Sequence, residues 1–321
     1  MAQPTNLTDR YDINGVREDL IDAITNTSPE KTPVVASFGR DTASNTYHEW
    51  QRDSLRAANA DNAAIDGDDA TASALSATGR VANYAQIFQQ TVATSRRANR
   101  VKKAGRKTEQ AYQKAKAYKE LQRDVEKMIL SNNAAVAGNS STASKSGGAG
   151  VMIYTNAYHN GAGATASHTS GAPTTAVTAG TNRAFTETLL KTAAQGAFTN
   201  SGEVPRMVVM SPSHKTIFST FTGIAVNRYQ VGKKEQGRIV GGADVYMSDF
   251  GEMEIVPHYL QVGASDVFGF NPDYGTVVYL DGFQSTPLAK TGDSDKEQVL
   301  VDCLLRLDAE NCHFKIANLT P

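Results

Sequence analysis

The chain has 321 residues, of which 40% are hydrophobic and 20% are charged, and its formal net charge is −1. This composition is typical of a globular protein with one large domain or two, and the near-neutral charge excludes a general polyanion binder. Two cysteines, Cys303 and Cys312, are too few for a disulfide scaffold and match no metal-ligand spacing, which fits a reducing cytoplasm.

The first 34 residues have the pattern of an arm. The start MAQPTNLTDRYD has no basic stretch followed by an apolar run, so no signal peptide is expected. Helical spacing in GVREDLIDAI predicts one short amphipathic helix, with apolar positions at Val16, Leu20, Ile21 and Ile24. Such a short helix is marginal alone, so we expect it to dock on another surface.

A long polar loop follows a predicted strand over residues 32–39. From Ala57 to Arg80 the large apolar side chains are Ile65 and Leu75, and the segment is rich in alanine and aspartate. The return leg, residues 80–94, fits a strand or a helix equally well. The two legs predict a long protruding hairpin or flap whose apolar surface lies at its base, close to Trp50.

The most regular helical pattern covers residues 108–131. Charged and amide side chains fill most of one side, and Thr108 is the candidate N-cap. The other side carries a predicted apolar stripe of Ala111, Ala115, Tyr118, Leu121, Val125, Met128 and Ile129. The pattern predicts a helix of roughly 24 residues, about 36 Å long, lying on a sheet or a neighbouring element.

The second half predicts a mixed α/β region that ends in long strands. Residues 131–183 are rich in glycine, and only 151–154 (VMIY) suggest a strand there. A helix from about 183 to Gly202, a buried strand at 207–210 and a short helix at 214–221 follow. The last long strand is predicted from period-two alternation of Val299, Val301, Cys303, Leu305 and Leu307.

The sequence offers no catalytic set, and we expect no enzyme, cofactor or metal. It has no dinucleotide or phosphate-loop motif, no nucleophile elbow and no pair of histidines at ligand spacing. Asp66, Asp68 and Asp69 could hold a divalent cation through oxygen ligands, but they lack the spacing of a calcium loop. A solvated acidic loop tip is the simpler interpretation.

Charge is nevertheless segregated along the chain. Residues 96–107, RRANRVKKAGRK, hold seven lysines and arginines and no acid, whereas residues 57–79 hold four aspartates and no base. The basic run could contact phosphates, although it has no interleaved aromatic residue for base stacking. It could also be a solvated helix entry, or it could lie under the acidic loop of a second copy of the chain.

Long blocks of this sequence resemble the major capsid proteins of tailed double-stranded DNA bacteriophages, which have the Hong Kong 97-type fold. The similar blocks are GVREDLIDAITNTSPEKTP, HEWQRDSL, NYAQIFQQTV, GRKTEQAYQKAKAYKELQRDVEKMIL and PLAKTGDSDKEQVLVDCLL. They cover both ends and most of the first 130 residues. The turn after Val92 and the passage from Ser144 to Thr181 depart from the pattern.

The resemblance implies an α+β chain with the parts of that capsid fold. These are an N-terminal arm (1–34), an extended loop (35–95), a peripheral domain with a long spine helix (96–140), an axial domain (141–274) and C-terminal strands that return to both domains (275–321). It further implies a structural head protein that assembles into pentamers and hexamers of an icosahedral shell around double-stranded DNA.

For such a protein the expected site residues make contacts between copies. We expect Trp50 and Phe88 to anchor the extended loop. We expect the basic residues Arg96, Arg97, Lys102 and Lys103 to meet Asp66, Asp68 or Asp69 of a neighbour. The implied partners are further copies of the chain, with scaffolding, decoration and portal proteins, weakly contacted DNA and no membrane. The implied location is the virion, assembled in the bacterial cytoplasm.

Two alternatives stay open at this point. An encapsulin-like nanocompartment has the same fold and would enclose an enzyme cargo instead of DNA. A cytoplasmic α/β enzyme could instead use residues 57–80 as a mobile lid. The direction of the loop distinguishes the enzyme from a shell protein, because a lid folds back over its own body whereas an assembly loop projects away from it.

Overall fold

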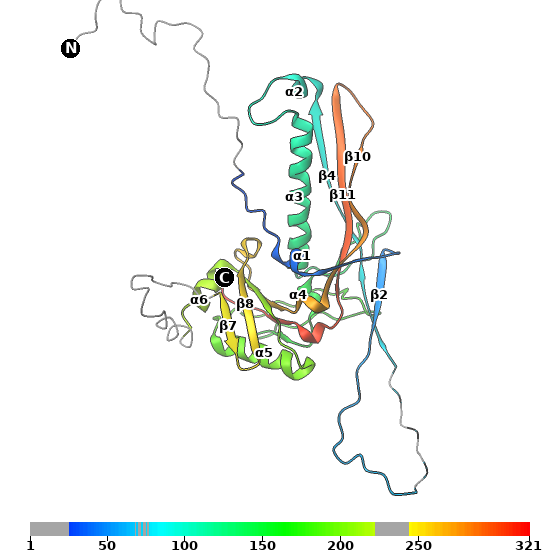
Figure 1. Cartoon of the computed structure of the whole chain (residues 1–321), viewed down its shortest axis with the longest axis vertical. Helices are drawn as coiled ribbons and strands as arrows, with labels where there is room; N and C mark the ends of the chain where they lie inside the picture. Colours follow the sequence, from blue (N-terminus) through cyan, green and yellow to red (C-terminus); the bar gives the residue numbers. More distant parts are fainter. Residues whose placement is uncertain (1–25, 68, 70–71, 73–74, 76, 222–243) are drawn as a thin grey trace, which may run out of the picture.

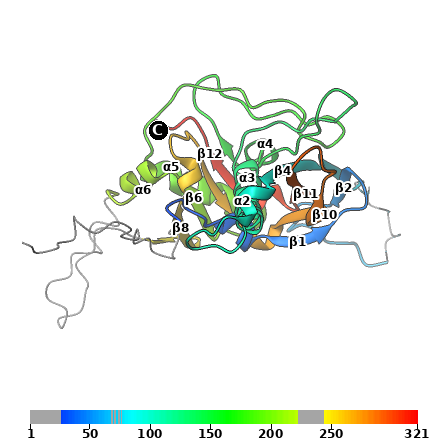
Figure 2. The same cartoon turned by 90° about the horizontal axis from the view of Figure 1, so that it is seen from above.

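The computed structural model describes residues 26–67, 69, 72, 75, 77–221 and 244–321, and Figure 1 shows their arrangement. The helix expected around Val16–Ile24 lies outside the described residues. A long helix stands over a four-stranded sheet at one end, and a six-stranded sheet with two helices forms a second part. Seen from above, these two sheets lie to either side of the long helix (Figure 2).

The spine helix α3 (Glu109–Ile129) confirms the predicted long helix. It packs against a sheet of order β1-β10-β11-β4, with bounds Gly39–Thr42, Gly275–Pro287, Ser294–Leu307 and Gln86–Ser95. Thr108 holds the N-cap position, but its side chain makes no capping hydrogen bond. The predicted return leg forms two strands, β3 (Gly79–Tyr84) and β4, rather than a helix.

The buried side of α3 differs from the predicted stripe near its start. Ala111 and Ala115 are exposed, whereas Ala117 is 1% exposed and joins Leu121 and Val125 in the core. The predicted stripe follows a heptad spacing of 3.5 residues per turn, which drifts around a helix of 3.6 residues per turn, so the first turns face a different direction from the last ones. The sheet covers the side that carries Ala117.

The predicted strand at residues 32–39 is wrong. Residues Pro33–Ser37 form the short helix α1, and only Gly39–Thr42 form a strand, β1, parallel to β10. Pro33 takes the first helical position, where its missing N–H costs nothing. The backbone N–H groups of Val34 and Val35 donate to the side chain of Glu126 on α3, at 2.8 and 2.7 Å.

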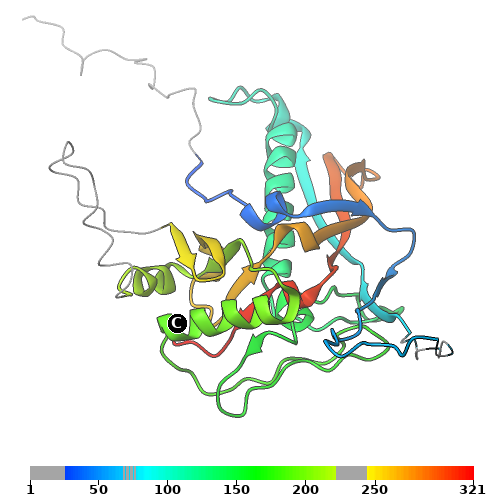
Figure 3. The same cartoon turned by 60° about the horizontal axis from the view of Figure 1, so that its bottom comes forward.

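The second sheet has the order β5-β12-β9-β6-β8-β7. Its strands are Ala157–Tyr158, Phe314–Ile316, Val267–Phe270, Met207–Met210, Gly251–Pro257 and Val245–Ser248. Helices α5 (Glu187–Ser201) and α6 (Pro212–Phe218) pack on it, and Figure 3 shows α5 running along it. The chain returns after β11 to place β12 inside this sheet, between β5 and β9.

The expected strand at residues 151–154 is also wrong. Residues Ala149–Met152 form a buried turn of helix, α4, which lies against the end of α3. A Cβ on Gly148 or Gly150 would collide with atoms of Ser131 and Asn132. The two glycines therefore allow a close backbone approach that a strand with larger residues would not make.

Glu126 joins the two parts of the molecule. Its side chain is fully buried and also accepts a hydrogen bond from Nε2 of His258, at 2.9 Å, at the end of β8. Nδ1 of His258 accepts from the N–H of Leu260, at 3.0 Å, so the hydrogen-bond network assigns the ring proton to Nε2. One carboxylate thus holds α1, α3 and the end of β8 together.

We expect Glu126→Gln to lower the free energy of unfolding by about 3 kcal/mol, because the amide would point a donor at a buried N–H group. Denaturant unfolding of the unassembled chain measures this. Glu120→Gln on the same helix is the control, since the one ion pair of Glu120 among the described residues is with the exposed Lys116, at 3.5 Å, and the substitution should change stability by less than about 0.5 kcal/mol. Equal effects of the two substitutions would contradict the importance of the buried carboxylate.

A buried histidine should make the stability depend on pH. Burial lowers the pKa of His313 from 6.5 to about 4, and its Nδ1 accepts from the N–H of Asn271 at 3.1 Å. The unfolded chain therefore binds this proton first as the pH falls. His313 therefore does not lower the free energy of unfolding above about pH 6.5. Between pH 6.5 and pH 4 it lowers that free energy by about 3 kcal/mol.

His313→Asn keeps an acceptor near the Asn271 N–H and removes this titration. Burial lowers the pKa of His48, His159, His168 and His214 as well, so the test is the difference between the two pH profiles of unfolding free energy. Parallel profiles for the two proteins between pH 6.5 and 4 would show that His313 does not titrate as described.

Candidate assembly surfaces

The extended loop leaves its own body. Strands β2 (Tyr47–Arg52) and β3 form a two-stranded ribbon, and the described residues of 53–78 run outward from its end (Figure 1). The side chains of Leu55, Ile65 and Leu75 are 98%, 78% and 96% exposed. A lid of an enzyme would fold back over its own body, and the described part of this loop does not.

The base of the loop is fixed by contacts within the chain. Trp50 is half-buried against the core, and its Nε1 donates to the carbonyl of Leu307 at 3.1 Å. The Tyr47 hydroxyl donates to the carbonyl of Ser170 at 2.8 Å, and Arg52 donates to the Tyr154 hydroxyl at 2.7 Å. Trp50 therefore anchors the loop on its own body, and these contacts set the direction in which the loop leaves.

The glycine-rich passage supports the same base. The N–H of Ala82 on β3 donates to the carbonyl of Gly171 at 3.1 Å. Gly171 has φ +85°, and a Cβ there would lie 2.6 Å from the carbonyl oxygen of Arg80. Glycine is needed at this position both for its backbone conformation and for the close approach of β3.

Phe88 is buried within its own chain. Its side chain is 9% exposed and belongs to the core cluster between α3 and the four-stranded sheet. The structure therefore leaves little of Phe88 for a neighbouring copy. Its contacts fix β4, the strand that follows the loop, in its own chain.

The acidic residues lie at the outer end of the loop. Asp66 and Asp69 are exposed, and Asp68 lies outside the described residues. Gly67, with φ +81°, turns the chain between them. Among the residues that the structure describes, no group of three or more histidine, cysteine, aspartate or glutamate side chains could hold a metal ion.

The basic run forms a corner at the other end of the molecule, around α2 (Arg96–Arg100) and the turn into α3 (Figure 1). Ser95 caps α2 by accepting from the N–H of Ala98 at 3.1 Å. Arg96 pairs with Asp293 at 2.8 Å, and Lys103 pairs with Glu109 at 3.6 Å. Part of the predicted basic surface is therefore neutralised within the chain.

Four exposed basic residues of this corner form no ion pair with any residue that the structure describes: Arg97, Arg100, Lys102 and Lys107. The structure does not bring the basic corner and the acidic loop together in one chain, because they lie at opposite ends (Figure 1). Any pairing between them requires a second copy.

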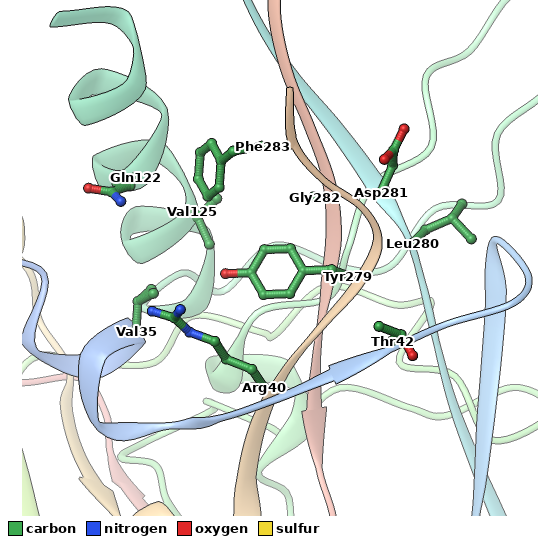
Figure 4. A pocket seen from close by; sticks show the side chains of 10 residues that line it. All are labelled: Val35, Arg40, Thr42, Gln122, Val125, Tyr279, Leu280, Asp281, Gly282 and Phe283. Carbon is green, nitrogen blue, oxygen red and sulfur yellow. The ribbon is translucent and has the colours of Figure 1, made fainter. Parts of the chain in front are cut away.

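Sequence reasoning missed a pocket of about 410 Å³ between α1, α3, β1 and β10 (Figure 4). Val35 and Val125 are its buried apolar residues, and the rings of Tyr279 and Phe283 lie 6.4 Å apart along β10. Gly282 lies inside the β10 segment, and a glycine within a strand is a sequence signal of a bulge or another irregularity.

Both cysteine side chains are free thiols buried in the interior. Burial raises the pKa of Cys303 to about 12, so the thiol stays protonated at neutral pH. Burial also raises the pKa of Cys312. No helix of the described residues is long and apolar enough to span a membrane.

Comparison with solved structures shows the Hong Kong 97-type capsid fold. The chain is similar to a structure described as the capsid asymmetric unit of cyanophage A-1(L), at a TM-score of 0.65 and 12% identity over 99% of this chain and 100% of that chain. An encapsulin from Synechococcus elongatus PCC 7942 matches at a TM-score of 0.50 and 9% identity, over 92% of each chain. The fold alone therefore includes both phage capsids and encapsulins.

Sequence comparisons separate these two groups. The major capsid protein of Escherichia phage Phieco32 is 36% identical over 134 residues, which are 42% of this chain and 38% of that protein. The chain thus matches less than half the length of this relative. The family model of the SU10 major capsid protein matches residues 3–320, and the chain therefore belongs to the SU10 major capsid protein family.

Proposed function

We propose that this chain is the shell subunit of a phage head, which assembles into pentamers and hexamers of an icosahedral capsid around double-stranded DNA. The observation that carries the proposal is the extended loop. Its base is fixed by hydrogen bonds from Tyr47, Trp50 and Arg52, while Leu55 beyond the base is 98% exposed. Ordering a loop costs conformational entropy, and contacts with a neighbouring copy offset that cost.

The parts of the chain have corresponding places in the proposed shell. Residues 1–34 are the arm, 35–95 the extended loop, 96–140 the peripheral domain with α3, and 141–274 the axial domain at the five- and six-fold centres. Residues 275–321 return to both domains. Head-to-tail contacts between identical copies close into rings when each copy repeats the same rotation, which suits a loop that leaves the body in a fixed direction.

The other partners follow from this function. The proposed location is the virion after assembly in the host cytoplasm, with scaffolding, decoration and portal proteins as further partners. The formal net charge of −1 suits an inner surface that contacts packaged DNA only weakly. The contacts of the site residues are structural, and we assign no catalytic step.

We further propose that the basic corner of one copy meets the acidic loop of the next. Arg97 and Lys102 are exposed and lack an ion pair among the described residues, so they are available for Asp66 and Asp69 of a neighbour. Arg96 and Lys103 contribute less because Asp293 and Glu109 already pair with them.

Electron microscopy of the nuclease-treated protein tests the shell. We expect angular, closed particles of uniform size from the chain expressed alone or with its scaffolding protein. Particles that package a protein cargo instead of DNA during infection would support the encapsulin-like alternative. A chain that stays monomeric in sedimentation velocity under both expression conditions would contradict the proposed function.

Charge reversal tests the contact between the corner and the loop. We expect Arg97→Glu with Lys102→Glu to block shell formation and to leave the subunit folded, because two attractive contacts per interface become repulsive. Adding Asp66→Lys with Asp69→Lys should restore shells. Particle yield from a density gradient and the circular dichroism of the free subunit are the measurements.

Lys145→Glu is the matched control, because Lys145 is an exposed lysine outside both surfaces. It should assemble like the original chain. Normal shells from the variant Arg97→Glu with Lys102→Glu would argue against the pairing. So would failure of the fourfold variant to form shells, if Asp66→Lys with Asp69→Lys alone forms them normally.

A further inference from the structure

The pocket of Figure 4 exists because one strand stops early. β1 pairs with β10 only from Thr276 to Tyr279, whereas β10 continues to Pro287. Within the described residues, no strand pairs with that edge of β10 beyond Tyr279. The register between β10 and β11 shifts on either side of Asp281, so β10 is irregular between Tyr279 and Phe283, and both rings line the pocket beside α3.

The lining of the pocket is apolar with a charge at each end. Val35 and Val125 are buried, while Tyr279 and Phe283 are only partly buried although they pack on the core. Burial raises the pKa of Tyr279, so its phenol stays neutral. Arg40 and Asp281 lie on opposite sides of Tyr279 (Figure 4).

The segment Asp53–Arg56 carries the matching pattern. Leu55 is a large aliphatic side chain with 98% of its surface exposed, three residues beyond the end of β2. An exposed acid, Asp53, precedes it and an exposed base, Arg56, follows it. The loop runs away from α3 and β10 in its own chain, so the segment does not fill this pocket from within (Figure 1).

We propose that the pocket receives Leu55 of a second copy, with Asp53 of that copy next to Arg40 and Arg56 next to Asp281. The inference rests on the proposed function and adds to it the acceptor site of the loop. Docking removes the exposed surface of Leu55 and the open apolar walls from water together. The two rim charges fix the direction in which the segment lies across the pocket.

Disulfide trapping tests the docking directly. The pair Leu55→Cys and Gln122→Cys puts one thiol on the segment and one on the exposed rim residue of α3. Oxidised shells of this variant should give a ladder of covalent multimers on a denaturing gel. Each single substitution should give none, because Cys303 and Cys312 are buried.

Leu55→Cys with Lys191→Cys is the matched control, since Lys191 is exposed on α5 and away from the pocket. Shells without a ladder from the first pair, or an equal ladder from the control pair, would overturn the docking and leave the shell function standing. A Gln122→Cys thiol that is shielded from a thiol reagent in the unassembled subunit would show that the chain's own residues cover the pocket, and would also overturn the inference. Failure of the original chain to form shells would count against the function instead.

A charge swap checks the direction of the segment. Asp53→Arg alone and Arg40→Asp alone should each raise the subunit concentration needed for assembly by roughly threefold, and the two together should restore it. Additive losses in the double variant would show that Asp53 and Arg40 are not neighbours in the shell.

Discussion

The buried carboxylate of Glu126 is the contact on which the relative placement of the chain's parts depends. A buried charge without partners costs several kcal/mol, and α3 cannot supply partners from its own backbone. The three donors come from Val34, Val35 and His258, which belong to the segment before β1 and to the end of β8. The carboxylate of Glu126 therefore has all its hydrogen-bond donors only when both segments are in place. One side chain thus couples the four-stranded sheet, the six-stranded sheet and the entry of the N-terminal segment.

The hydrogen bonds of Glu126 also influence the direction of the extended loop, through a short series of contacts. α1 leads into β1, which pairs with β10, and the ribbon of β2 and β3 begins a few residues later. Trp50 and Arg52 then tie the ribbon to the end of β11 and to the glycine-rich passage. The interior therefore determines where the loop starts and points. The described residues beyond the base contribute little to the core, and their apolar side chains gain burial only from another molecule.

Much of the regular structure could be predicted from the sequence because its pattern is local. The alternation of Val299 to Leu307 indicates which side of the strand faces the core, and the pattern of 108–131 does so for the helix except in its first turns. The errors have causes far away in the chain. Residues 33–37 form a helix because Glu126 receives their N–H groups, and 149–152 form one because Gly148 and Gly150 let the backbone approach α3. The assembly residues were predicted from composition, which cannot show that Asp293 already pairs with Arg96 or that Phe88 is buried. The pocket beside Tyr279 depends on where β1 stops, and no periodicity reports that.

The base of the loop and the residues beyond it have different roles in the proposed contact between copies, and this affects how a ring of copies would close. If each copy lays its loop on the next, the angle between copies depends on the direction of the ribbon, and the strength of the contact depends on the residues beyond it. Tyr47, Trp50 and Arg52 hold the ribbon by hydrogen bonds to Ser170, Leu307 and Tyr154, and these partners come from three separate segments. A small shift of any one segment would turn the ribbon without weakening the outer contacts. If the proposed shell has five-fold and six-fold rings of this chain, such a turn would distinguish them, so we infer that the base of the loop, rather than its charged outer end, accommodates the two geometries.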